Sequence, residues 1–293
     1  MRVRRTLAAV AVLPLALVAA ACAPESDGGS SATGSSSGSP SADACATGSL
    51  PLKTAGRLTI GTDSPAYEPW FVDNDPTNGK GYESAVAYAV AEQLGFGKDQ
   101  VTWVKVPFNS SYAPGAKKFD FDINQISISE KRAQAVDFSD GYYSAAQAVI
   151  ALKGTRGAEA ASLADLKGLR LAAQTGTTSL TAIRDVIKPD TDPVVFEDTN
   201  AAKQALQNDQ VDAIVADLPT AFYISGAEIE NSVLIGQFQP ETGEQEEFGL
   251  LFEKGSKLVP CVNSALGALR EDGTIDQLEK QWLSDVVDVP VLQ

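Results

Sequence analysis

The feature that most constrains the fold is a regular alternation of short apolar segments with segments of helical period. The chain shows it first over residues 57–128, where the strand pattern RLTIGTD is followed by GYESAVAYAVAEQLGF, whose apolar residues recur at three- and four-residue steps. It shows the alternation again over residues 147–217. Strands that alternate with helices predict α/β domains with mostly parallel sheets. The two runs therefore predict two consecutive α/β units.

Other segments also show the residue period of a strand or of a helix. We expect strands at VTWVKV, FDFDINQISI, QAVIALK, LRLAAQ, PVVFED, VDAIVAD, SVLIGQF and EFGLLFEKG, and helices at EKRAQAV, SLTAIRDVI, AAKQALQND, VPCVNSALGALRED and IDQLEKQWLSD. Ligands of open α/β sheets bind beyond the carboxyl ends of the strands. The residues that follow each strand are therefore the candidates for a site.

The N-terminal segment predicts export. Three arginines fall within the first five residues, an apolar run covers residues 7–21, and Cys22 follows three alanines. This layout predicts a signal peptide over residues 1–21, because the apolar run is too short for a comfortable transmembrane helix. The alanines before Cys22 look like the lipobox of bacterial lipoproteins. That likeness implies a lipidated Cys22 and an extracytoplasmic, membrane-anchored protein, whereas ordinary cleavage and a free secreted protein are the alternative. Residues 22–49, rich in Ser, Gly and Ala, are expected to form a flexible tether.

Composition excludes several classes of protein. The chain has no histidine, which excludes Ser-His-Asp and Cys-His nucleophilic sites and His-ligated zinc. Its formal net charge of −15 argues against nucleic acid as a partner. We expect no metal and no other cofactor. Cys45 and Cys261 are an even pair in an exported chain, which predicts one disulfide, with two buried thiols as the alternative.

The stretch QISISEKR carries a candidate anion site. Ser129 has the position of a helix N-cap, three residues before Arg132, and Ser127 adds a second hydroxyl. A guanidinium fork beside hydroxyl groups suits a carboxylate. The alternative is a capped surface helix with a solvated arginine.

The second unit offers two further candidates. QTGTT joins a strand to a helix and could present backbone N–H groups to an anion, although on these residues alone a simple βα turn is the better interpretation. Asp217 ends a buried strand, where it could pair with an ammonium group or cap the next helix. Asp63 and Tyr67 follow the first strand and are open to turn and core interpretations. Arg132 and Asp217 together outline the two ends of a zwitterion.

The order of several motifs resembles a known family. LTIGTD, SISEKRAQAVDFSDGYY, FGLLFEKGS and VNSALGALREDGTIDQLEKQWL fit, in order and spacing, the polar amino-acid-binding proteins of bacterial ABC importers, extracellular solute-binding family 3. The resemblance implies a periplasmic-binding-protein-like (type II) α/β fold of two lobes with two hinge crossovers. It places lobe I at residues 50–145 and 247–293 and lobe II at residues 146–246.

The resemblance also assigns roles to residues. The family's carboxylate-binding arginine falls on Arg132 with its hydroxyl partner on Ser127, and the ammonium-binding aspartate falls on Asp217. The remaining ligand-binding positions fall on Asp63, Tyr67, Gln125, Gln174, Thr177 and Thr178. Gln125 departs from the small residue common at its position, and this departure leaves the side-chain specificity open.

The function implied is capture of a polar amino acid, such as glutamine or a cationic amino acid, and its delivery by hinge closure to a permease and ATPase complex. A monomer anchored to the membrane by lipid and without catalytic residues is expected. Two alternatives use the same fold. One is a dehydratase-type enzyme, for which Asp63 or Glu68 could serve as the catalytic acid, and the other is a ligand-sensing binding module.

Overall fold

The structure is a computed structural model that describes residues 45–239, 245–283 and 289–293. The predicted signal peptide 1–21, Cys22 and the tether up to residue 44 lie outside these residues. Within the described ranges, no helix combines the length and apolar character that a membrane span requires.

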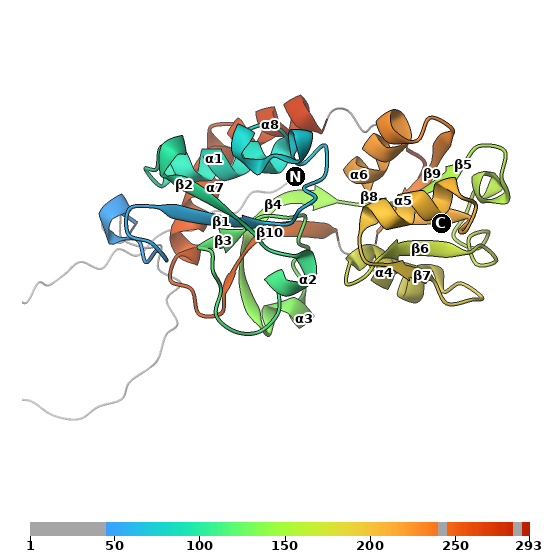
Figure 1. Cartoon of the computed structure of the whole chain (residues 1–293), viewed down its shortest axis with the longest axis horizontal. Coiled ribbons are helices and arrows are strands. Elements are labelled where there is room, and N and C mark those ends of the chain that lie inside the picture. Colours follow the sequence, from blue (N-terminus) through green and yellow to red (C-terminus); the bar gives the residue numbers. More distant parts are fainter. Residues whose placement is uncertain (1–44, 240–244, 284–288) are drawn as a thin grey trace, which may run out of the picture. The chain divides into compact units, whose positions relative to one another are not determined.

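The first of two five-stranded sheets combines strands from the N-terminal part of the described chain with the much later strand β10 (Figure 1). Its strand order is β2-β1-β3-β10-β4, with the strands at Val101–Lys105, Leu58–Thr62, Phe121–Asp122, Glu246–Glu253 and Val136–Ala145. The strands β2, β1 and β3 are parallel, whereas β10 runs antiparallel to both β3 and β4. The sheet is therefore mixed but mostly parallel, as the sequence predicted. The ten-residue strand β4 was not predicted, because VDFSDGYYSA mixes polar and apolar residues without a clear period.

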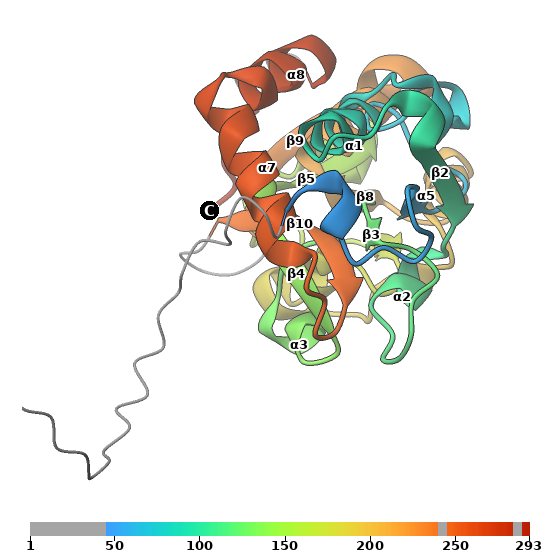
Figure 2. The same cartoon turned by 90° about the vertical axis from the view of Figure 1, so that its left-hand side faces the viewer.

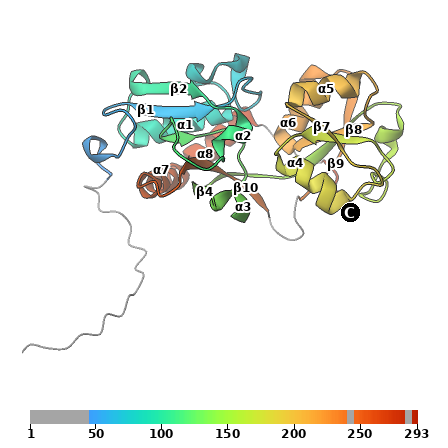
Figure 3. The same cartoon turned by 60° about the horizontal axis from the view of Figure 1, so that its bottom comes forward.

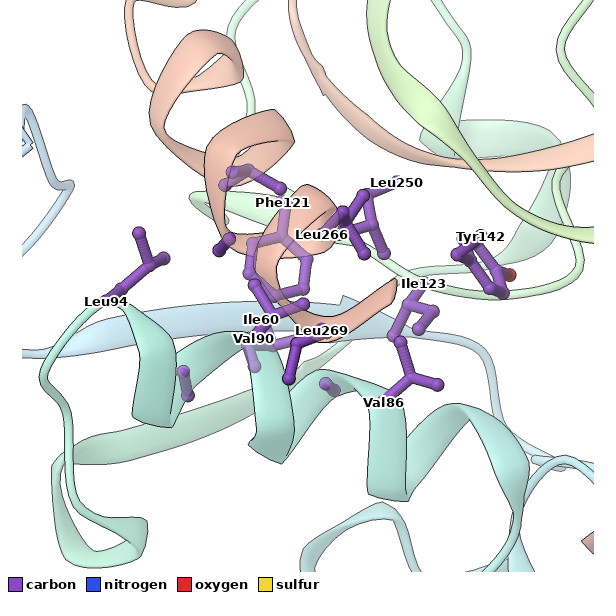
Figure 4. Packing of buried hydrophobic residues seen from close by; sticks show 14 of the residues in the cluster. Ile60, Val86, Val90, Leu94, Phe121, Ile123, Tyr142, Leu250, Leu266 and Leu269 are labelled. Atoms are coloured by element: carbon purple, nitrogen blue, oxygen red, sulfur yellow. The ribbon is translucent and has the colours of Figure 1, made fainter. Parts of the chain in front are cut away.

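Three helices cover one face of this sheet: α1 (Tyr82–Gln93), α7 (Val259–Glu271) and α8 (Thr274–Trp282). Figure 2 shows α7 and α8 beside α1, in agreement with the contacts between them. Apolar side chains of α1 and α7 meet those of β1 and β3 in one core, as Val86, Leu266, Ile60 and Phe121 do in Figure 4. The apolar period of α1 predicted this core-facing stripe. The short helices α2 (Phe108–Ser111) and α3 (Glu130–Ala133) follow β2 and β3.

The second sheet has the strand order β7-β6-β8-β5-β9. Its strands are Val194–Phe196, Leu171–Gln174, Ala213–Asp217, Gln147–Leu152 and Ser232–Phe238. Again three strands are parallel, and β5 runs antiparallel to both β8 and β9. Successive residues of β5 enter separate cores, Val149 packing with Leu180 and Ile150 with Leu206. Figure 3 shows α4 (Thr178–Ala182) and α5 (Thr199–Gln207) on opposite sides of this sheet, and α6 (Leu218–Tyr223) follows β8.

We call the two α/β bodies the first and the second lobe. β4 of the first sheet leads through Ala146 directly into β5 of the second, and the chain returns from β9 to β10. The C-terminal residues differ from the sequence-based boundary, which assigned everything after residue 246 to the first lobe. Gln237 of β9 donates to Pro290 O and accepts from Leu292 N–H, both at 2.8 Å, so residues 289–293 pack on the second lobe.

The start of the described chain is tied to the first lobe. Cys45 and Cys261 form a disulfide, as the cysteine count predicted, which links this segment to α7. Thr47 donates its hydroxyl to Leu94 O at 2.9 Å. The prediction of a tether reaching residue 49 is therefore wrong for residues 45–49, because the disulfide and this hydrogen bond hold them on the folded body.

Candidate functional site

A pocket lies where strands of the two lobes end. Residues from both lobes line it: Asp63, Tyr67, Phe108, Asn124, Gln125, Gln174, Thr177, Thr178, Ser179, Thr199, Val215, Ala216, Asp217 and Thr220. Seven of the nine predicted ligand-binding residues belong to this lining. The other two, Ser127 and Arg132, lie next to it and contact lining residues or their turn.

Asp63 and Tyr67 form part of the first-lobe wall. Asp63 accepts the Ser64 N–H at 2.6 Å and the Phe108 N–H at 3.0 Å, so its carboxylate orders the turn after β1 and the start of α2. Its turn role and its place in the pocket are thus compatible. The Tyr67 hydroxyl is buried without a hydrogen-bond partner among the described residues. Burial raises the pKa of Tyr67 to about 12, so it remains a neutral donor.

Gln125 is held by a buried acid that sequence reasoning missed. Its backbone has φ +47°, and its N–H donates to Glu83 Oε1 at 2.6 Å. Its side-chain amide and the Tyr142 hydroxyl also donate to Glu83, which is fully buried at the start of α1. Burial raises the pKa of Glu83 to about 7. Glu83 therefore fixes the position from which Gln125 faces the pocket.

Arg132 is buried and joins the two lobes. It exposes only 9 % of its surface, and its Nη1 donates to Ser127 O at 2.8 Å while its Nη2 donates to Gly176 O at 3.0 Å. The guanidinium also lies over the rings of Tyr112 and Phe108, at 4.8 and 5.6 Å from their centroids. Ser129 caps α3 as predicted. The alternative of a solvated surface arginine is wrong, because burial, carbonyl groups and aromatic rings enclose the side chain.

The QTGTT turn faces this arginine from the second lobe. Thr177 caps α4, accepting the Leu180 N–H at 3.1 Å and donating to Gln174 O at 2.8 Å. Gln174 accepts from the Thr199 hydroxyl at 2.9 Å, which joins the turn to α5. Thr178 Oγ1 lies 3.2 Å from Ser127 Oγ of the first lobe. The turn thus places hydroxyl and amide groups opposite the first-lobe residues.

Asp217 stands at the end of β8 and points into the pocket. It occupies the N-cap position of α6 without a side-chain capping bond, so the capping interpretation is wrong for its carboxylate. Its Oδ1 instead accepts from Gln147 Nε2 at 2.9 Å. Burial, with a further contribution from the charge of Glu246, raises the pKa of Asp217 to about 8.

Gln147 and Glu246 do not line the pocket but form hydrogen bonds to residues of the site, and the sequence did not indicate them. Gln147 Nε2 donates to Glu246 Oε2 at 2.7 Å as well as to Asp217, and Gln147 Oε1 accepts from the Ser179 hydroxyl at 2.6 Å. Both residues begin antiparallel strands, and Gln147 pairs in register with Asp217. A search of the carboxyl ends of strands passes over them, because an antiparallel strand brings its amino end to that edge.

Two further polar groups lie at or near the pocket. Trp70 Nε1 donates to Thr220 Oγ1 at 2.7 Å, a buried hydrogen bond between the lobes. Asn124 lines the pocket and is 95 % buried, yet its Nδ2 has no hydrogen-bond partner among the described residues. A buried amide without a partner costs free energy, so this group favours a polar ligand.

Comparisons with known proteins agree with the fold. The model of the bacterial extracellular solute-binding proteins, family 3, matches residues 58–285. The L-cystine-binding protein TcyA of Bacillus subtilis (strain 168) is 31 % identical over 242 residues, which cover 80 % of this chain and 84 % of that protein.

Two solved structures extend the comparison. An ancestral arginine-binding protein bound to glutamine has a TM-score of 0.66 and 30 % identity over 79 % of this chain and 99 % of that one. The ancestral amino acid-binding protein AncCDT-1, a precursor of cyclohexadienyl dehydratase, has a TM-score of 0.65 and 30 % identity, covering 78 % and 95 %. With a family match over most of the chain and the predicted residues gathered around one pocket, this protein belongs to the bacterial extracellular solute-binding proteins, family 3.

Proposed function

We propose that this protein is the extracytoplasmic binding protein of an ABC importer and that it captures a polar amino acid between its lobes. The observation that carries the proposal is a pocket lined from both lobes, with a buried guanidinium beside one wall and the carboxylate of Asp217 in the other. Family membership supports the transport role. The relatives named above, which bind cystine, arginine and glutamine, support an amino acid as the ligand.

In this proposal Arg132 and Ser127 bind the ligand's carboxylate and Asp217 binds its ammonium group. A guanidinium has five N–H donors, and the two carbonyls that Arg132 contacts leave others for the ligand. Thr177 and Thr178 approach the carboxylate from the second lobe. Tyr67 packs on the ligand, and Asp63, Gln125 and Gln174 receive its side chain, which suits glutamine or a cationic amino acid.

Affinity requires both lobes. A micromolar dissociation constant corresponds to about 8 kcal/mol, whereas one charge-assisted hydrogen bond contributes only about 1.5–3 kcal/mol. Closure of the lobes around the ligand removes water from both charged groups and strengthens their interactions. The closed form is then the form that the permease recognises. In this arrangement the protein acts as a monomer, held at the membrane through lipid on Cys22.

A thermal-shift panel of L-cystine, L-glutamine, L-arginine, L-lysine and L-glutamate tests the function. A ligand that binds only the folded state raises the melting temperature, and calorimetry then gives the dissociation constant. We expect a rise with at least one of the first four amino acids and none with glutamate, whose side chain would meet Asp63. No rise with any amino acid would reject the proposal.

An enzyme is the second candidate, because one structural neighbour is a precursor of a dehydratase. Asp63 or Glu68 would be its catalytic acid. Incubation with a cyclic amino-acid precursor, followed by absorbance of the aromatic product, separates the two functions. We expect no product from this protein, even at protein concentrations high enough to saturate the binding assay.

A further inference from the structure

Strand β10, which follows the return of the chain from the second lobe, places a second carboxylate near Asp217. Glu246 is buried, with 8 % of its surface exposed, and accepts from Gln147 Nε2 at 2.7 Å and from the Ser127 hydroxyl. Gln147 Oε1 accepts a hydrogen bond from the Ser179 hydroxyl, which orients the amide so that its nitrogen faces the two acids. Both hydrogens of that nitrogen are used, one by Asp217 Oδ1 and one by Glu246 Oε2. The two carboxyl groups are therefore held close together by a single amide.

Within the described ranges, no cation forms a salt bridge with either carboxyl group. Arg132 is within electrostatic reach of both, but its hydrogen bonds go to the carbonyls of Ser127 and Gly176. The other titratable groups acting on Asp217 are Glu83, which adds negative charge, and Tyr143, which is neutral. Two carboxyl groups thus face one guanidinium.

The position of the pair suits an α-amino group. The amino and carboxylate groups of an α-amino acid are attached to the same carbon, so the groups that bind them must be adjacent. Glu246 accepts hydrogen bonds from Ser127, which is proposed to bind the ligand's carboxylate, and from Gln147, whose amide also donates to Asp217. Within the described residues no group of three or more acidic or cysteine side chains has the geometry to hold a metal ion, which favours an organic cation. The unpartnered Asn124 amide, which lines the same pocket as Asp217, independently favours a polar ligand.

We propose that Glu246 is the second carboxylate of the ammonium-binding end of the site, and that the Asp217–Glu246 pair exchanges a bound proton for the ligand's ammonium group. The inference rests on the proposed function and adds a residue and a linkage to it. The two carboxyl groups share one amide and face a single guanidinium, so Asp217 retains a proton in the ligand-free protein. The raised pKa of Asp217, about 8, agrees with this. The arriving ammonium supplies the positive charge, and the proton leaves to solvent.

Calorimetry at pH 7 in buffers of different ionisation enthalpy counts the protons released on binding. The probe is whichever of L-cystine, L-glutamine, L-arginine and L-lysine gives the largest thermal shift. We expect the wild-type protein to release about one proton per ligand. Glu246→Gln keeps the shape of the side chain and removes the contribution of the Glu246 charge to the raised pKa of Asp217, so it should reduce the proton release while weakening binding about tenfold or more.

Matched variants make the result specific. Glu247→Gln removes the same charge from the next, exposed residue of β10 and should leave both proton release and affinity unchanged. Glu246→Asp retains the charge and should retain proton release, which keeps the test valid if Glu246→Gln fails to fold. Binding without proton release in the wild type, or release unchanged in Glu246→Gln, would overturn the inference and leave the proposed function intact. Tighter binding in Glu246→Gln would also overturn it, because Glu246 would then compete with the ligand's carboxylate. If no amino acid binds, the proposed function itself fails.

Discussion

At the scale of single residues, Arg132 has two tasks. It is proposed to bind the carboxylate of the ligand, and it also donates hydrogen bonds to one backbone carbonyl of each lobe, Ser127 O and Gly176 O. A planar guanidinium can do both because its donors diverge in one plane, whereas an ammonium group offers a point charge on a flexible stem. The rings of Tyr112 and Phe108 hold this plane. The residue therefore controls geometry as well as charge.

We expect Arg132→Lys to lower affinity for the amino acid found in the panel by at least about tenfold, and Arg132→Ala by about a hundredfold, since each lost charge-assisted hydrogen bond is worth about 1.5–3 kcal/mol. Calorimetry measures both. Arg184→Ala removes an exposed arginine and serves as the control. Wild-type affinity in Arg132→Ala, with the circular dichroism spectrum intact, would reject the assignment of this residue to the site.

At the scale of elements, Glu83 connects α1 to the residues that follow β3 and to β4. Its carboxyl group accepts from Gln125 N–H at 2.6 Å, from the Gln125 amide and from the Tyr142 hydroxyl. Glu83 is fully buried, so these hydrogen bonds form a polar contact between α1, β4 and the residues after β3 inside an apolar core. Burial outweighs the hydrogen bonds that favour the charged form, because the pKa of Glu83 is raised from 4.5 to about 7.

This shift predicts how stability depends on pH. The unfolded chain releases the Glu83 proton near pH 4.5 and the folded protein near pH 7, so the contribution of Glu83 to stability is fully present below about pH 4.5 and is lost as pH rises through 7. The loss is on the order of 3 kcal/mol. Urea unfolding at a series of pH values from 4.5 to 8 measures it.

Two variants isolate the effect from that of other acids. Glu83→Gln cannot ionise and should remove this part of the pH dependence, leaving a flatter curve than the wild type. Glu92→Gln, at an exposed position on the same helix, should leave the slope unchanged. A wild-type slope in Glu83→Gln would show that the ionisation of Glu83 does not limit stability in this range.

At the scale of the whole molecule, a small number of polar contacts hold the two lobes together around the pocket. Trp70 donates to Thr220 at 2.7 Å, Arg132 donates to Gly176 O at 3.0 Å, and the hydroxyls of Ser127 and Thr178 lie 3.2 Å apart. Each has one partner in each lobe, so each would be lost if the lobes separated. Lobe closure is then a balance that a ligand can shift by contacting both sides.

Thr220→Val tests this balance without touching the charged groups. The substitution keeps the shape of the side chain, removes the acceptor of the Trp70 N–H and should weaken ligand affinity about threefold to tenfold, because a buried donor is left without a partner. Small-angle scattering should show compaction of the wild type on ligand binding and a larger ligand-free radius of gyration in the variant. Thr181→Val, at an exposed position, is the control. A wild type that binds tightly without any compaction would contradict the closure mechanism.

The sequence alone determined the α/β class, most element positions and the chemistry of Arg132 and Asp217, because local period and residue type are properties of short segments. Family motifs placed seven of the pocket residues. Only the tertiary structure decided that Gln147 and Glu246 contact residues of the site. Gln147 and Glu246 are the first residues of β5 and β10. Because these strands run antiparallel to their neighbours, their amino ends lie near Asp217, the last residue of β8. Strand direction is set by pairings between distant segments, and no local pattern records it.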